Sequence, residues 1–229
     1  MIVFKNHRHY HIFSLKNGSV GEMTATNDAS VTITRFRYLM LRVSSIHSET
    51  TIQFSKLRLY RGDDDNNCYN WCKDMTEFTD LFECVEAIRA DGTRGSSGEE
   101  AVNALMGIGG ASQGNDGTQY GKMCYINVTF PAYYVYDVDK AGIGRRIDVS
   151  AYDMWCWYTS NDTQKYPGRN MKDFDLYVSN DRTTWTLVGE AESVESVNRN
   201  YSVGYRGKFG FVYETSGGEQ TQKTMKLQI

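Results

Sequence analysis

Short runs of alternating apolar and polar residues dominate this chain and predict β-strands. Successive side chains on a strand point to opposite sides, so the run 36–43 has two faces, one of Leu39, Leu41 and Val43 and one of Tyr38, Met40 and Arg42. The same alternation recurs at 126–130, 174–178, 209–213 and 225–229. Several short strands joined by polar turns are typical of an antiparallel sandwich or barrel, so we predict an all-β fold.

The run 52–60 changes phase in its middle. Its apolar residues begin as Ile52 and Phe54 and continue one position later as Leu57 and Leu59. An odd-numbered step of this kind reverses the face that the side chains occupy. We therefore predict a β-bulge or a break near Ser55.

One segment has helical rather than strand spacing. Between 75 and 90 the apolar positions follow a helical period; these positions are Phe78, Leu81, Phe82, Val85 and Ile88. A capping sequence at 74–77 suits the start of a helix, and Asp91-Gly92 suits its end. We predict one short amphipathic helix there. The stretch 91–122 is rich in Gly, Ser and Asn, with a further short helix possible at 99–106.

The first 35 residues carry weaker strand signals, at 10–15 and 31–34. We interpret residues 1–35 as an arm or extra strands and residues 36–229 as the sandwich domain. His7, His9 and His11 alternate, so on a strand they share one face. A metal site or an oligomer axis would explain them, but a solvated edge strand is the simpler interpretation.

Composition narrows the function classes. The net charge is −3 over 229 residues without a basic stripe, which argues against nucleic-acid binding. No apolar run approaches the roughly 18 residues of a membrane span. The start is too polar for a signal peptide, and the five cysteines are an odd number. We expect a protein made in a reducing cytoplasm without a disulfide framework.

The most specific stretch is 147–187. A strand ending in an aromatic residue leads to Thr159-Ser160-Asn161-Asp162, then Arg169, then a second strand and Ser179-Asn180-Asp181 followed by Trp185. Asn and Asp suit a tight turn because their side chains bond to their own backbone. Asp162 and Arg169 have the right types for a bidentate pair, and Trp185 suits a core position.

This combination resembles the discoidin-like, or coagulation-factor C-type, family of carbohydrate-binding-module-like β-sandwiches. The runs 36–43 and 52–60 and the segment 98–104 are similar to further parts of the family pattern. The resemblance implies a discoidin-like jelly roll, here circularly permuted, because the paired strands that close the domain in most members come first.

The family's structural Ca²⁺ is the point at which the chain departs from the pattern. Where the family has an acidic residue before Gly, this chain has Met106. Asp116 is a weak substitute, since Ca²⁺ takes oxygen ligands from a bent loop. A structural Ca²⁺ is the only cofactor that the resemblance suggests.

The resemblance also implies a ligand site at one end of the sandwich. Sugars offer both C–H faces and hydroxyls, which suits an aromatic platform beside amide and guanidinium groups, and the candidate ligand residues are Trp157, Tyr158, Asn161, Tyr166 and Arg169. The candidate turn and core residues are Trp155, Asp162, Asn180, Asp181 and Trp185. In the competing interpretation, Trp155 and the pair Asp162–Arg169 only stabilise the core and the turn and do not contact a ligand.

Catalysis has little support in the sequence. No phosphate-loop, nucleophile-elbow or zinc-protease motif occurs, and the adjacent carboxylates Glu99 and Glu100 are expected to diverge. We expect a non-enzymatic virion-surface or adhesion protein of the kind found in tailed phages, multicopy or homo-oligomeric, that decorates a capsid or tail and contacts glycans and other virion proteins. The alternative is a purely structural assembly protein whose sandwich has lost ligand binding.

Overall fold

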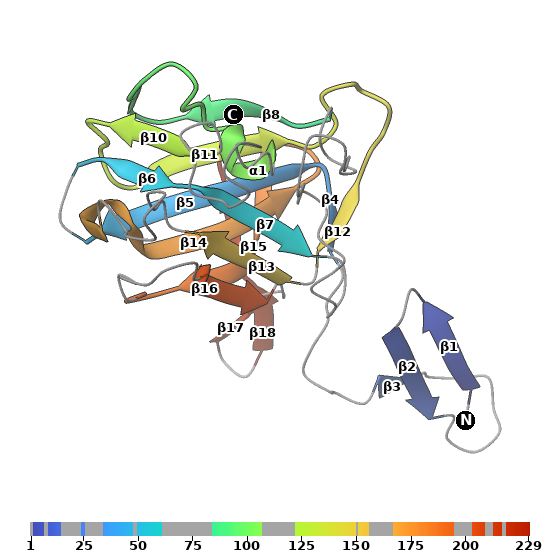
Figure 1. Cartoon of the computed structure of the whole chain (residues 1–229). Coiled ribbons are helices and arrows are strands. Elements are labelled where there is room, and N and C mark those ends of the chain that lie inside the picture. The colour runs from blue at the N-terminus through green and yellow to red at the C-terminus, as the bar shows by residue number, and fades with distance from the viewer. Residues whose placement is uncertain are drawn as a thin grey trace.

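The computed structural model describes residues 2–6, 9–14, 24–25, 34–47, 50–60, 84–106, 122–149, 151–155, 167–194, 203–208, 213–216 and 219–229. Among these residues the strands pair antiparallel, and helix is limited to the single turn α1 (Asn103–Met106) and the 3₁₀ turn η1 (Pro167–Arg169) (Figure 1). The predicted all-β sandwich is confirmed.

A six-stranded sheet forms one layer. Its order is β19 (Thr224–Lys226), β15 (Thr184–Ala191), β14 (Met171–Ser179), β5 (Tyr38–Ile46), β11 (Ala132–Asp137) and β8 (Glu86–Ala90). The long central strand β5 pairs with β14 on one side and β11 on the other. Segments from both halves of the chain therefore meet at the middle of this sheet (Figure 1).

The facing layer consists of two three-stranded sheets. One has the order β6 (Ile52–Phe54), β10 (Met123–Ile126) and β9 (Thr93–Arg94), and the other has the order β16 (Val203–Lys208), β13 (Ala151–Trp155) and β7 (Lys56–Tyr60). β6 and β7 join different sheets on either side of a bend at Ser55. The predicted break is therefore confirmed.

Three smaller pairings complete the description. β4 (Thr34–Phe36) pairs with β12 (Ile147–Val149), and β17 (Tyr213–Ser216) pairs with β18 (Glu219–Gln222). β1 (Ile2–Asn6), β2 (His9–Ser14) and β3 (Thr24–Ala25) form a sheet of their own. His9 and His11 lie two residues apart in β2, which is the middle strand of this sheet and not the edge strand that we expected. His7 is outside the described residues.

The main core lies between the two layers. Leu39, Leu41 and Val43 of β5 and Phe174, Leu176 and Val178 of β14 all belong to it, which confirms the predicted alternation of both strands. The opposite face of β5 contributes Tyr38 and Met40 to a second cluster with Val135 and Trp185. Met225, Leu227 and Ile229 pack against that second cluster, as their spacing predicts.

The helix predicted over 75–90 is wrong in its last turn, because residues 86–90 form β8. β8 pairs with β11 through an irregular register between Val135 and Tyr136. That irregularity turns Ala87 and Ala90, three residues apart, toward the main core, while Ile88 packs on the second cluster. Val85 and Ile88, which the helical period placed on one face, therefore belong to different clusters. Residues 75–83 are outside the described residues. The short helix foreseen within 99–106 is confirmed by α1.

The strand predicted at 126–130 is also wrong. β10 ends at Ile126, Asn127 adopts a φ of 55°, and a cis peptide joins Phe130 to Pro131. Val128 is nevertheless buried in the main core and Phe130 packs against it, so these apolar residues anchor a loop. The next strand, β11, has apolar or aromatic side chains on both faces and lacks the alternation that would have revealed it.

Candidate functional site

The structure describes only one of the five predicted ligand residues. Arg169 ends η1, whereas the other four ligand candidates, Trp157, Tyr158, Asn161 and Tyr166, lie outside the described residues together with Asp162 and Asp116. The backbone of Trp155 ends β13, where it pairs with Lys56 and Val203. The candidate site is therefore defined by Arg169 and the residues around it.

Arg169 meets the middle residue of β6. Its Nη1 donates a hydrogen bond of 2.8 Å to Oε1 of Gln53. The residues on either side, Ile52 and Phe54, face the main core, so Gln53 projects from the opposite face of the sheet. It is nonetheless only 2% exposed. A polar residue at an outward position is usually solvated, whereas this one is buried.

A chain of polar side chains continues from Gln53 across β10. Cys124 is the cross-strand partner of Gln53, and its Sγ lies 3.5 Å from Gln53 Oε1. The backbone N–H of Cys124 donates to the carbonyl of Glu99, and the Glu99 carboxylate forms a 2.8 Å ion pair with Lys122. We call Gln53, Glu99, Lys122, Cys124 and Arg169 the Gln53 cluster.

Burial sets the protonation of the thiol in this cluster. Desolvation and the nearby Glu99 carboxylate raise the pKa of Cys124 to about 11. The thiol therefore stays protonated at neutral pH and is suited to act as a donor to Gln53, not as a nucleophile.

The amide nitrogen of Gln53 is the exception in this network. Gln53 Oε1 lies within hydrogen-bonding distance of both Arg169 and Cys124, which fixes the orientation of the amide. Gln53 Nε2 is buried and has no hydrogen-bond partner in the structure. A buried donor without a hydrogen-bond partner costs about 1–3 kcal/mol of stability. The site therefore lacks a hydrogen-bond acceptor for this amide.

Sequence reasoning found Arg169 but missed the rest of the Gln53 cluster. Gln53 stands between Ile52 and Phe54, a pattern that predicts an exposed polar residue on an outer face. Only the tertiary structure brings Cys124 and Lys122 beside it. Glu99 and Glu100 do diverge, since Glu100 pairs with Arg94 at 2.6 Å instead.

The predicted turn residues hold the hairpin between β14 and β15. The Asp181 carboxylate accepts hydrogen bonds from the backbone N–H groups of Thr183 and Thr184 at 2.8 and 2.7 Å. These bonds lower the pKa of Asp181. Asn180 bridges to the start of β5 by accepting from the N–H of Arg37. Trp185 is fully buried, and its Nε1 donates to the carbonyl of Leu227.

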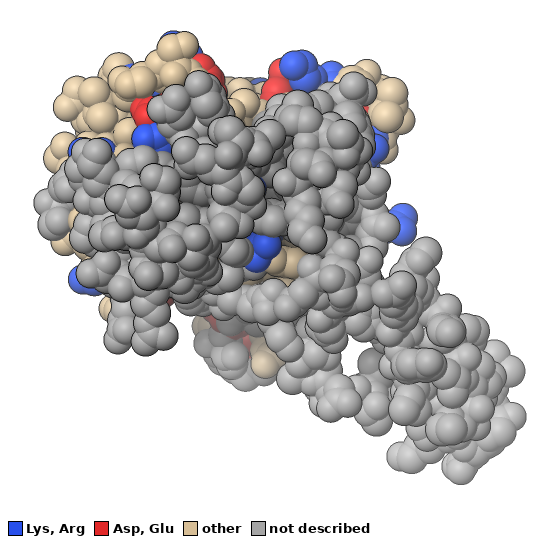
Figure 2. Space-filling model, viewed as in Figure 1, with Lys and Arg blue, Asp and Glu red and all other residues tan. Residues whose placement is uncertain are grey.

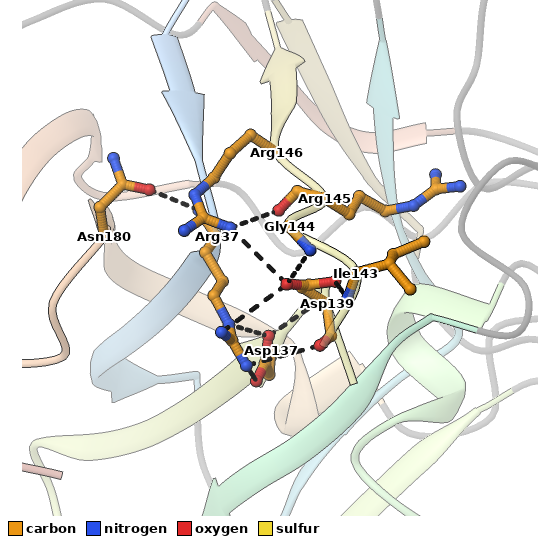
Figure 3. Close-up of polar contacts among 8 residues, drawn as sticks. All are labelled: Arg37, Asp137, Asp139, Ile143, Gly144, Arg145, Arg146 and Asn180. Carbon is orange, nitrogen blue, oxygen red and sulfur yellow. Dashed lines mark hydrogen bonds and ion pairs between the residues drawn. The ribbon is translucent and has the colours of Figure 1, made fainter. Parts of the chain in front are cut away.

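A second buried polar cluster, at the end of β11, is a structural anchor (Figure 3). Arg37 forms a bidentate pair with Asp137 at 2.7 and 2.9 Å. Asp139 is 1% exposed on its side chain and accepts from the backbone N–H groups of Ile143 and Gly144. Desolvation opposes ionisation of Asp139, but backbone donors and Arg37 lower its pKa overall. These contacts hold the loop 140–146, which presents Ile143 to solvent.

A groove of about 510 Å³ lies on the outer face of the six-stranded sheet. Its charged lining is mainly acidic, with Asp173, Asp175, Glu190, Glu192 and Glu214 beside Arg42 and Lys223. Arg42 pairs with Asp175 at 2.6 Å, and Lys223 pairs with Glu190 at 3.0 Å. Desolvation raises the pKa of Asp175 despite its bond to Arg42. Acidic and basic groups are also interspersed over the coloured atoms of Figure 2.

Comparison with known proteins gave no match to this chain. No family model matches it, and neither the curated proteins nor the solved structures contain a significant match. Within the described residues, no helix is long and apolar enough to cross a membrane. The same part of the chain holds no group of three or more acidic, His or Cys side chains arranged to bind a metal ion.

Proposed function

We propose that this protein is a non-enzymatic, discoidin-like carbohydrate-binding β-sandwich carried in many copies on a virion surface, such as a phage capsid or tail. The observation that carries the proposal is the unmet amide donor of Gln53 next to Arg169. A sugar hydroxyl or carboxylate supplies the acceptor that this amide lacks. A planar amide beside a guanidinium is also a suitable donor set for the oxygens of a sugar.

Two features of the Gln53 cluster favour binding over catalysis. Its thiol is protonated at neutral pH, and its carboxylate is committed to Lys122. A covalent mechanism needs an activated nucleophile, and the described residues of this cluster supply none. A weak single site of this kind gains strength when many copies act together on one surface.

A glycan array tests the binding function. The full chain is displayed multivalently on beads and compared with Arg169→Ala and Trp157→Ala. Glu190→Gln, in the groove on the other layer, is the matched control. We expect binding to a defined set of glycans that both site variants lose and the control keeps, with far-ultraviolet circular dichroism unchanged.

The outcome also decides between the candidate roles. If the multivalent protein binds no glycan, carbohydrate binding is refuted and the structural assembly role takes its place. If Glu190→Gln alone abolishes binding, the ligand occupies the groove and the Gln53 cluster is not the site. Antibody labelling of intact particles from the source of the chain tests the virion location, and unlabelled particles contradict it.

A further inference from the structure

We infer that copies of this chain associate with one another, with the loop 140–146 of one copy docked in the groove of another copy. The groove is the one on the outer face of the six-stranded sheet. The inference goes beyond the proposed glycan binding and does not depend on it, because neither surface includes a residue of the Gln53 cluster.

The groove carries an excess of negative charge. Its lining holds five carboxylates and two cations, so its formal charge is 2 − 5 = −3. Each of the two cations is already paired with one carboxylate, and Lys172, just outside the lining, offsets the charge of Asp173. Two carboxylates are then in excess. Glu192 and Glu214 are exposed and lie outside these ion pairs, so they are the ones available to a cationic partner.

The groove also has an apolar part. Tyr177, Leu187 and Ala191 line it together with the charged residues. Tyr177 is only half-buried, and a tyrosine ring attracts a guanidinium placed over its face. The volume of about 510 Å³ lies within the range of about 300–1,000 Å³ that is usual for binding pockets. The groove therefore suits a short segment that is both basic and apolar.

The loop 140–146 has that composition. Arg146 is paired with Asp139 at 3.8 Å, whereas Lys140 and Arg145 form no ion pair in the described part of the chain. Ile143 is 71% exposed and is the only large hydrophobic side chain among the described residues that is mostly exposed. The side chains of Ile143 and Arg145 extend away from Asp139 (Figure 3). Two available cations thus match the two available carboxylates of the groove.

The loop is held in shape before a partner binds. The Asp139 side chain is 1% exposed, and its carboxylate accepts hydrogen bonds of 2.9 and 3.0 Å from the backbone N–H groups of Ile143 and Gly144. The N–H of Gly142 donates to the carbonyl of Asp139. Because these bonds already order the loop, docking costs less conformational entropy than ordering a flexible segment would.

The loop and the groove of one copy are too far apart to meet. Arg37, which pairs with Asp139 at the base of the loop, precedes β5, whereas Arg42 and Ser44 line the groove near the other end of β5. At about 3.3 Å per residue, this stretch of strand separates them by about 15–25 Å. The anchored loop therefore contacts the groove of another copy. A second copy is the favoured partner because every chain carries both complementary surfaces.

Sedimentation velocity of the full chain tests the inference. We expect the weight-average sedimentation coefficient to rise with protein concentration at low salt, because docking converts single chains into larger species. The association should weaken as salt rises, since salt screens the attraction between exposed charges.

Two double variants connect the association to the two surfaces. The loop variant, Lys140→Gln with Arg145→Gln, and the groove variant, Glu192→Gln with Glu214→Gln, should each weaken self-association at least tenfold. Each variant keeps the surface that the other has lost, so an equimolar mixture should form a complex between them. Arg94→Gln is the control, because it removes an exposed cation outside both surfaces. Thermal unfolding of each variant checks that the fold survives.

The opposite results are equally specific. A single monomeric species at every concentration overturns the inference, and so does self-association that either variant retains at full strength. If both variants lose association and their mixture does not recover it, the loop does not dock in the groove. If spermine binds a chain that stays monomeric, and only the groove variant loses spermine, the groove takes a small cation instead of a second copy. None of these results changes the test of glycan binding.

Discussion

Lys122 and Glu99 form an ion pair that is largely removed from water, at 2.8 Å and with little exposure of either side chain. Removing one partner of such a pair strands the other charge. Lys122→Met should therefore lower the free energy of unfolding by about 3 kcal/mol, measured by urea denaturation.

Two controls make that prediction specific. The double variant Lys122→Met, Glu99→Leu removes both charges and should recover much of the loss. Arg94→Met breaks an exposed pair and should cost less than about 1 kcal/mol. A Lys122→Met protein as stable as the wild type would mean that the pair is solvated.

Acid stability depends on carboxylates that accept several hydrogen bonds. Backbone donors lower the pKa values of Asp173, through Ser193, and Asp181, through Thr184 and Thr183. Because their folded pKa values lie below the unfolded value of about 3.9, they stabilise the fold above that pH, and the contribution is lost as pH falls through the folded values. Asp175, whose pKa is raised, acts in the opposite direction.

Stability should accordingly fall between about pH 4 and pH 2. Asp181→Asn should be less stable than the wild type at pH 7 and lose less on acidification. Thermal unfolding followed by circular dichroism over this pH range measures both effects. Parallel curves for the two proteins would show that Asp181 does not contribute.

At the level of elements, the turn between β8 and β9 depends on a glycine. Gly92 has a φ of +92°, and an added Cβ would lie 2.9 Å from Val128 Cγ2 and 3.0 Å from the carbonyl oxygen of Ile126. Gly98 also has a positive φ, of +84°, but open space around it. Comparing alanine substitutions at Gly92 and Gly98 therefore separates the cost of backbone strain from the cost of steric overlap.

We expect Gly98→Ala to cost about 1 kcal/mol, which is typical of a non-glycine residue at positive φ. Gly92→Ala should cost clearly more, because Val128 and the chain near Ile126 must move as well. Chemical denaturation of both variants measures the difference. Equal losses of stability in the two variants would mean that the loop at Val128 moves at no cost in free energy.

The edge strand β19 and the residues after it cover the second cluster. Trp185 is fully buried beneath this segment and donates its Nε1–H to the carbonyl of Leu227. Removing residues 225–229 should expose the indole and shift the tryptophan emission to longer wavelength. The same truncation in a Trp185→Phe background should not produce the shift. That result would assign the emission shift to Trp185 among the four tryptophans of the chain.

At the level of the whole molecule, the N-terminal strands and the sandwich are separate in their pairing. In the described part of the chain, β1, β2 and β3 pair only with one another. β4 belongs to the sandwich instead, since it pairs with β12 and Phe36 is fully buried in the main core. The expected boundary after residue 35 thus falls within β4.

A chain that starts at residue 30 should unfold at the same temperature as the full chain, because it keeps β4. A chain that starts at residue 37 loses the β4–β12 ladder and the Phe36 side chain, and should be less stable by about 3 kcal/mol or more. Calorimetry on the two truncations checks this. Equal stability of both would show that β4 is dispensable.

Strands whose core side chains keep a regular period could be predicted from the sequence, even where, as in β5, the other face is buried as well. Segments with uniformly apolar residues or an irregular register could not. β5, β14 and the break at Ser55 follow from the period of their side chains. β11 was missed because Tyr133 and Val135 on one face are as apolar as Tyr134 and Tyr136 on the other. β8 was misread because Val85 and Ile88 continue the helical spacing of Phe78, Leu81 and Phe82, although Val85 belongs to the main core and Ile88 packs on the second cluster.

The sequence by itself determined the all-β class, the main-core faces and the polar turn at Asn180 and Asp181, because these depend on local period and on side chains that bond nearby. It also singled out Arg169. Only the tertiary structure decided that Gln53, Cys124 and Lys122 gather beside Arg169, because β6, β10 and η1 are distant along the chain and meet only across the sheet. The unmet amide donor on which the proposed site depends exists only in that arrangement.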